Sequence, residues 1–189
     1  MSKKIKVVLL GDSIRMNYGE LTAKKLGDGC SVWQPEDNCR FIKYTQRGVF
    51  YDWREFICGS DIVHFNCGLW DTCDLAGDGP FSAIDEYTAQ LVRTAKELQR
   101  ISKKVIFATT TPVRPGQEHN NNERIMAYNK SAVSAMEDIG VQINDLWTPV
   151  YADLEGCIRA DDLIHLTDKG IDICSDLAAD IITRTAATL

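Results

Sequence analysis

The chain has no long hydrophobic run, and no apolar stretch approaches the ~18 residues that a membrane-spanning helix needs. It contains only three histidines, and its seven cysteines form no CxxC pair and show no regular spacing. Internal repeats, low-complexity tracts and linker-like shifts in composition are also missing. These absences argue against a membrane protein, a repeat protein and a zinc site built from clustered Cys and His ligands.

Composition and charge favour one globular domain spanning 1–189. The hydrophobic share of 44% and the charged share of 25% are ordinary for a protein of 189 residues with a single core. The net charge of −6 disfavours a surface for nucleic acid or for an anionic membrane. The cysteines are odd in number and lack pairing signals, so we expect reduced, mostly buried thiols and a cytoplasmic location.

Strands and helices are expected to alternate along the chain. The basic start precedes a short apolar run that ends in Gly11, so we interpret this run as a core strand and not as a signal peptide. The expected strands are 5–10, 30–34, 61–66, 104–110 and 140–144. The expected helices are 17–26, 46–57, 82–101, 120–138 and 167–187.

Several of these strands are continuously apolar, which is typical of parallel strands that are covered on both faces. The alternation predicts an α/β protein, a three-layer α/β/α sandwich around a five-stranded parallel sheet. Ligands of such folds bind beyond the carboxyl ends of the strands. Ser13, the 66–71 segment and the turn at Thr111-Pro112 are expected to emerge there.

Ser13 follows the first expected strand in Gly11-Asp12-Ser13-Ile14, where a hydroxyl can stand exposed to a substrate. A serine hydroxyl is a poor nucleophile near neutral pH and needs an adjacent general base. The alternative is that Ser13 caps a helix starting near Arg15, because serine is a favoured N-cap. The two roles are compatible, since the amides at a helix start also face a developing oxyanion.

The C-terminal part of the chain supplies matching partners in Asp162-x-x-His165. Histidine is the natural base for a serine, because its ordinary pKa lies near neutrality. A carboxylate on the other ring nitrogen fixes the tautomer and stabilises the imidazolium. An Asp three residues before the His can reach the ring, so Ser13, Asp162 and His165 suggest a Ser-His-Asp arrangement.

Polar residues also follow the third expected strand. Asn66 ends this strand, and its amide is placed to point toward a substrate oxygen beside Ser13, unless it serves only to form a turn. Gly68 would let the backbone approach closely. Trp70 is expected in the core or in a pocket wall, and Asp71 is expected to brace a loop as a hydrogen-bond acceptor.

Taken in order, these short motifs resemble the SGNH (GDSL) hydrolases over nearly the whole chain. The resemblance implies a flavodoxin-like α/β/α fold and ester hydrolysis by a Ser-His-Asp triad, with no metal and no cofactor. Ser13 would be the nucleophile and one backbone oxyanion donor, with Asp162 and His165 completing the triad. The glycine amide that normally follows the second strand has its closest equivalent in Asn38, with Gly48 as the alternative.

The block after the third strand departs from the family pattern Gly-x-Asn-Asp, because Trp70 stands where the Asn donor belongs. One oxyanion donor is worth about 10²–10³ in rate, so its loss would be serious. We expect Asn66 to replace it, on the same strand face if the strand continues that far.

Four further residues are expected to contact substrate. Arg15 and Arg114 would lie on the rim and bind a polar or anionic group, unless they are only solvated surface residues. Gly68 and Trp70 would line the site. His119 is expected in an exposed loop, with Asn120 beside it, near enough to touch substrate.

These features together predict a serine esterase that removes a short acyl group, such as acetyl, from a polar carrier such as a carbohydrate. The expected partner is a small-molecule or glycan ester, with no nucleic acid and no membrane, and the sequence indicates no oligomeric state. Two alternatives stay open. One is a lysophospholipase- or thioesterase-type acylhydrolase, and the other is a non-catalytic ligand-binding domain of the same fold.

Overall fold

A parallel five-stranded sheet in the order β2-β1-β3-β4-β5 forms the centre of the molecule. The computed structural model describes residues 4–189, so residues 1–3 of the basic start lie outside the described residues. The strands are β1 (Ile5–Leu10), β2 (Cys30–Trp33), β3 (Ser60–Asn66), β4 (Ser102–Ala108) and β5 (Gln142–Asn144). All five expected strands are confirmed, and the order is that of flavodoxin-like folds.

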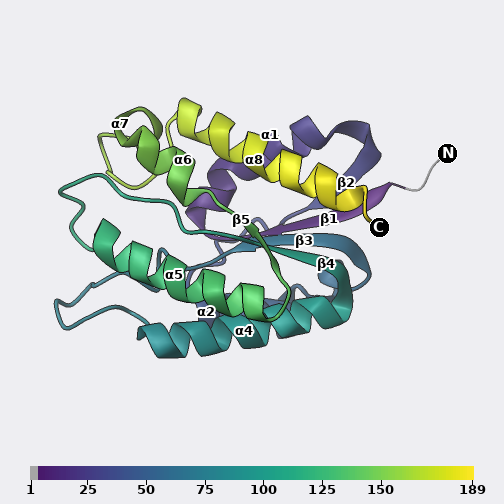
Figure 1. Ribbon diagram of the computed structural model, residues 1–189, viewed down its shortest axis with the longest axis horizontal. Helices are drawn as coiled ribbons and strands as arrows, with labels where there is room; N and C mark the ends of the chain where they lie inside the picture. Colours follow the sequence, from purple (N-terminus) through teal and green to yellow (C-terminus); the bar gives the residue numbers. More distant parts are fainter. Residues whose placement is uncertain (1–3) are drawn as a thin grey trace.

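Helices cover both faces of the sheet (Figure 1), which confirms the three-layer architecture. Helices α1 (Ser13–Leu26) and α8 (Asp168–Ala186) pack together on one face, and α4 (Ile84–Ile101) and α5 (Asn122–Asp138) on the other. The shorter elements are α2 (Ile42–Arg47), α3 (Arg54–Ile57), α6 (Trp147–Ala152), α7 (Leu154–Cys157), the 3₁₀ turn η1 (Gly27–Gly29) and the π-helical turn η2 (Gly48–Asp52). None of the helices within residues 4–189 is long and apolar enough to cross a membrane.

The strands bury alternate side chains against the two helical layers. Val8, Leu10, Val63, Phe65 and Phe107 belong to the cluster beneath α4 and α5, whereas their neighbours Val7, Leu9, Ile62 and Ile106 pack with residues of α8. This two-sided burial explains the continuous apolar runs, because neither face of the strands meets water. The seven cysteines are free thiols, of which four are buried and Cys58 is exposed.

The prediction of a single helix over 46–57 is wrong. Helix α2 ends at Arg47, the π-helical turn η2 follows, and a separate helix, α3, begins at Arg54. The N–H of Trp53 reaches the carbonyl of Gly48 five residues back, and the Trp53 ring lies where a side chain on Gly48 would be, 2.1 Å from an added Cβ. Packing of one ring over a glycine therefore breaks the helical repeat. Helices α6 and α7 were not expected either.

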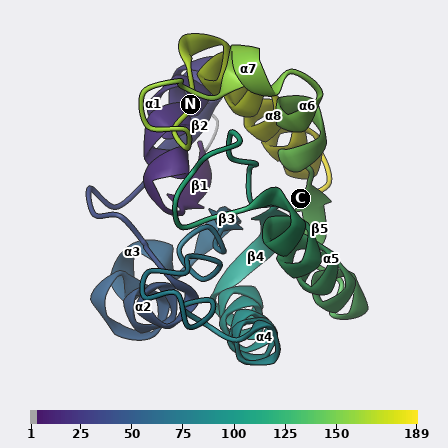
Figure 2. The same cartoon turned by 90° about the vertical axis from the view of Figure 1, so that its left-hand side faces the viewer.

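The connections that follow β1, β3 and β4 gather at one end of the molecule. Figure 2 looks onto this end and shows the long loops before α4 and before α5 on the viewer's side. The parallel strands bring their carboxyl ends to one edge, so residues far apart in sequence meet here. Ser13 and the segments after β3 and β4 therefore lie at the same edge of the sheet.

His64 lies in the middle of the sheet and is completely buried. Its Nε2 is 2.9 Å from Nδ2 of Asn144, which can only donate, so Nε2 accepts and the ring proton sits on Nδ1. Burial lowers the pKa of His64 to about 4, so the ring is neutral at physiological pH. It is therefore a core histidine.

We expect wild type to lose stability relative to a His64→Gln variant as the pH falls from about 6.5 to about 4. The folded-state pKa of His64 is lowered, so the unfolded chain takes up the proton first and acidification favours unfolding. The difference should reach on the order of 3 kcal/mol. Urea unfolding of both proteins across this range measures it, and parallel stability curves would contradict the assignment.

Candidate active site

Ser13, His165 and Asp162 form one hydrogen-bonded line. The ring Nε2 of His165 lies 2.9 Å from Ser13 Oγ, and its Nδ1 lies 2.9 Å from Asp162 Oδ2. A carboxylate can only accept, so Nδ1 carries the proton and Nε2 is free to take one from the serine. This is the geometry that a serine nucleophile and its general base require.

The loop that carries the acid and base is folded tightly before α8 begins. Leu163 adopts a left-handed conformation with φ of 65°, which turns the chain between Asp162 and His165. The backbone N–H of Arg159 donates to the carbonyl of His165, and the N–H of Arg114 donates to the carbonyl of Leu163. The turn and these two bonds hold the imidazole in its orientation.

Asp162 stays ionised because its surroundings favour the charge. Burial alone would raise its pKa, but the backbone N–H groups of His165 and Ile164 and the His165 side chain outweigh that effect and lower the pKa to about 2. Both N–H groups bond Oδ1, at 2.9 and 3.0 Å, which leaves Oδ2 for the ring. The carboxylate is thus available to stabilise an imidazolium.

Helix α1 begins at Ser13, four residues before the expected start, and Asp12 rather than Ser13 is its N-cap. Asp12 Oδ1 accepts the N–H of Ile14 at 2.9 Å. This corrects the alternative in which the serine itself capped the helix. The Ser13 hydroxyl is left for His165, and the Ser13 N–H is at the positive end of the helix dipole.

A polar group is buried directly behind this turn. Asp12 is completely buried, which raises its pKa to about 6, although the Ile14 N–H, the Arg15 charge and the Asn66 side chain act to lower it. Gly11 must be a glycine, because an added Cβ would lie 1.9 Å from Asn66 Oδ1. The nucleophile turn therefore packs against the end of β3 without any space between them.

Ser13 and His165 open into a cavity of about 350 Å³, which we call the Ser13 cavity. A cavity of this size suits a small ligand or one group of a larger one. Its other lining residues are apolar, Leu69, Trp70, Leu75 and Ile164, or polar, Asn38, Cys73, Gln117 and His119. Sequence reasoning did not find Leu75, Cys73 or Gln117, because no motif marks a loop residue as a cavity wall.

Asn38 lies at this cavity, as expected. Its side chain accepts the N–H of Arg40 at 2.8 Å, so the side chain serves the loop. In the part of the chain that the structure describes, its own backbone N–H has no acceptor. The alternative residue, Gly48, is buried beneath Trp53 in η2 and does not line the cavity.

The structure does not bring Asn66 to the cavity, which corrects the expectation that its amide stands beside Ser13. The side chain is 1% exposed and lies behind Gly11, against Asp12. Strand β3 ends at Asn66 and the chain turns at Gly68, where φ is 147°. The strand face therefore does not continue far enough to carry the amide into the site.

Neither arginine expected to bind substrate lines the cavity. Arg15 is 3% exposed, and its guanidinium bonds the carbonyls of Gly11 and Asp37 and the side chain of Gln34. Arg114 donates to the carbonyl of Ile158 at 3.3 Å. Both side chains hold loops together, because their guanidinium groups are hydrogen-bonded to backbone carbonyls of the fold and not directed to the cavity.

The Gly68–Asp71 segment acts partly as expected. Gly68 allows a close backbone approach, since an added Cβ would lie 2.4 Å from Thr110 Oγ1, but it does not line the cavity. Trp70 is 37% exposed and forms a wall. Asp71 is buried and accepts hydrogen bonds from Ser82 Oγ and from the N–H of Ile42, so it braces two loops.

His119 lies at the cavity, as its place in the sequence indicated. Its Nδ1 is 3.2 Å from the carbonyl oxygen of Asp74, which can only accept, so in the neutral ring Nδ1 carries the proton and Nε2 is an acceptor, with Glu118 Oε2 3.8 Å from it. Asn120 beside it is not exposed, which corrects that expectation. It is 4% exposed, and its side chain bonds Leu69 and Thr72.

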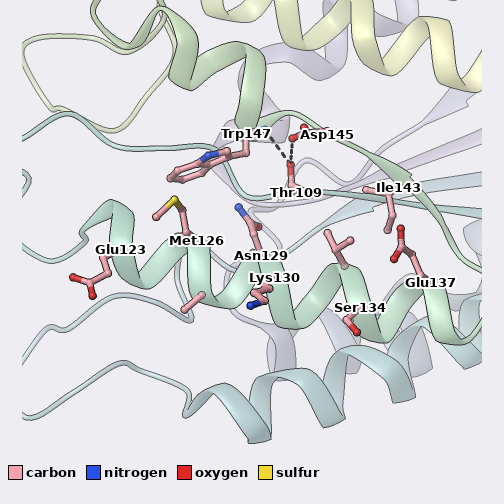
Figure 3. A pocket seen from close by; sticks show the side chains of 12 residues that line it. Thr109, Glu123, Met126, Asn129, Lys130, Ser134, Glu137, Ile143, Asp145 and Trp147 are labelled. Carbon is pink, nitrogen blue, oxygen red and sulfur yellow. Dashed lines mark hydrogen bonds between the residues drawn. The ribbon is translucent and has the colours of Figure 1, made fainter.

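A larger cavity, of about 700 Å³, lies between α5 and the β5–α6 segment (Figure 3). Its buried hydroxyl, Thr109 Oγ1, is 3.2 Å from Asp145 and accepts the N–H groups of Leu146 and Trp147. That hydroxyl is fully engaged in shaping the turn after β5. We therefore regard the smaller Ser13 cavity as the candidate active site, because there the Ser13 hydroxyl lies 2.9 Å from Nε2 of His165.

We expect a fluorophosphonate probe to label the wild-type protein at Ser13 with a single mass addition. His165 activates the hydroxyl, so Ser13→Ala should abolish labelling and His165→Ala should slow it by several orders of magnitude. Ser175→Ala, which removes a buried serine outside the cavity, serves as the matched control and should label normally. Intact-mass spectrometry is the readout, and absence of labelling at every pH would favour a ligand-binding domain.

No protein-family model and no curated protein matches the chain. Solved structures do match it. An acetyl xylan esterase is 20% identical, with a TM-score of 0.75, over 94% of this chain and 100% of that one. A catalytic mutant of an acetylxylan esterase from Geobacillus stearothermophilus is 15% identical, with a TM-score of 0.78, over 94% and 93% of the two chains.

A lipase/acylhydrolase from Enterococcus faecalis is 19% identical to this chain, with a TM-score of 0.75, and the match covers 94% of each. At these identities the likeness is one of fold. It extends over almost the entire length of this chain and of all three solved proteins. The chain has the α/β fold of these esterases and acylhydrolases, as its resemblance to the SGNH hydrolases predicted.

Proposed function

We propose that this protein is a serine esterase that hydrolyses carboxylic esters of a short acyl group, such as acetyl, on a polar carrier such as a carbohydrate. The observation that carries the proposal is the position of His165, 2.9 Å from both Ser13 Oγ and Asp162 Oδ2 at the mouth of a cavity. Structural neighbours that are named acetyl xylan esterases support the acyl preference.

In the proposed reaction Ser13 Oγ attacks the ester carbonyl carbon while His165 Nε2 takes its proton. Asp162 stabilises the imidazolium through Nδ1–H. The oxyanion accepts hydrogen bonds from the N–H groups of Ser13 and Asn38. The intermediate then collapses, the alcohol leaves with the proton from His165, and an acyl-enzyme remains. Water, deprotonated by the same base, releases the carboxylic acid and restores the serine.

The cavity supports a small acyl group. Its volume of about 350 Å³ is shared between the acyl and alcohol sides of the ester, and its apolar walls come from Leu69, Trp70, Leu75 and Ile164. A long acyl chain would have to extend past these walls into solvent. Its additional methylene groups would stay exposed to water there and would add no binding energy. We propose a cytoplasmic location as well, in keeping with seven unpaired thiols.

We expect p-nitrophenyl acetate and acetylated sugars to be hydrolysed, with kcat/KM falling as the acyl chain lengthens. Ser13→Ala should reduce turnover to background, because the oxyanion donors alone cannot supply a nucleophile. Steady-state hydrolysis across esters of increasing acyl length is the measurement. An optimum at long acyl chains would support an acylhydrolase of the lysophospholipase or thioesterase type instead.

Replacing His119 by Phe is expected to raise KM for an acetylated sugar about fivefold while leaving KM for p-nitrophenyl acetate unaffected. In the neutral ring Nε2 of His119 is an acceptor for a sugar hydroxyl, and one such hydrogen bond is worth on the order of 1 kcal/mol. The phenyl ring keeps the shape of the wall. Equal losses on the two substrates would argue against a role in recognising the carrier.

A further inference from the structure

The structure contains a buried cation directly beneath the nucleophile turn. Arg15 is 3% exposed, and the hydrogen bonds of its guanidinium go to neutral acceptors. Its Nη2 donates to the carbonyls of Gly11, at 3.2 Å, and Asp37, at 2.9 Å, and Nη1 donates to Gln34 at 3.3 Å. Burying a guanidinium costs stability, so its place here calls for a specific role.

The two carbonyls belong to the two segments that supply the oxyanion donors. Gly11 lies two residues before Ser13, and Asp37 lies immediately before Asn38. A second contact joins the same segments, since the N–H of Cys39 donates to the Gly11 carbonyl at 3.1 Å. The guanidinium and this backbone bond together fix the β1–α1 turn relative to the loop after β2.

The contact with Asp37 also fixes the direction of the neighbouring N–H. The bond between residues 37 and 38 is a trans peptide, so the Asn38 N–H points away from the Asp37 carbonyl and hence away from Arg15. Asn38 lines the Ser13 cavity, and its N–H has no acceptor among the described residues. A charge-assisted bond to the carbonyl polarises the whole peptide group, which makes its N–H a stronger donor.

We propose that Arg15 is a positioning residue that orients and polarises the Asn38 amide of the oxyanion hole through the Asp37 carbonyl. The inference rests on the proposed esterase function. It replaces the role in substrate binding that the sequence suggested for this arginine. Arg15 acts on the transition states and the tetrahedral intermediate, where the oxyanion develops, and not on substrate binding.

The test compares kcat and KM for p-nitrophenyl acetate in Arg15→Met, Arg15→Lys and the matched control Gln34→Leu. Gln34→Leu removes one guanidinium contact but keeps both carbonyl bonds, so kcat should stay within about twofold of wild type. Arg15→Met should lower kcat by about 10- to 10³-fold at nearly constant KM, the upper bound being the loss of one whole donor. Arg15→Lys keeps the charge and should fold, but the lysine side chain is one atom shorter, so its ammonium does not reach the place of Nη2 between the two carbonyls and kcat should fall as well.

Chemical rescue separates positioning from a general structural role. Guanidinium chloride at millimolar concentration should restore part of kcat in Arg15→Ala but none in Ser13→Ala. Unchanged kcat in Arg15→Lys, or a loss in Arg15→Ala that guanidinium does not reverse, would overturn the inference while leaving the esterase intact. An inactive wild-type protein would refute the esterase function, and the inference would fall with it.

Discussion

The carbonyl oxygen of Gly11 is the acceptor on which the arrangement of the site depends. It receives the N–H of Cys39 and the guanidinium of Arg15, so the end of β1 and the loop after β2 become one unit. There is no side chain on Gly11 because Asn66 occupies that space. The position of Ser13 follows from this junction, since α1 begins two residues later.

The second half of the site comes from the other end of the chain. Ser13 and His165 are 152 residues apart, yet α1 and α8 lie together on one face of the sheet (Figure 1). Asn17 in α1 accepts the N–H of Leu166 at 3.3 Å, which ties the histidine loop to the helix of the nucleophile. The packing of two helices thus aligns a nucleophile with its base.

Two carboxylates near the nucleophile differ because their surroundings differ. Asp12 is fully buried, which raises its pKa, whereas Asp162 receives two backbone N–H groups and an imidazole, which lower its pKa. The first carboxylate caps a helix and the second orients a base. Environment, and not residue type, assigns the two roles.

The sequence by itself determined the five strands, the layers of the fold and the identity of Ser13, Asp162 and His165 as the residues of the candidate site. Apolar runs and local motifs carry this information, because strand burial and a D-x-x-H turn are set within a few residues. Tertiary structure alone decided the rest. Asn66 and Arg15 were expected at the substrate and lie in the core, since the end of β3 and the carbonyls of Gly11 and Asp37 fix them there. A side chain's direction depends on distant packing partners, which no local pattern encodes.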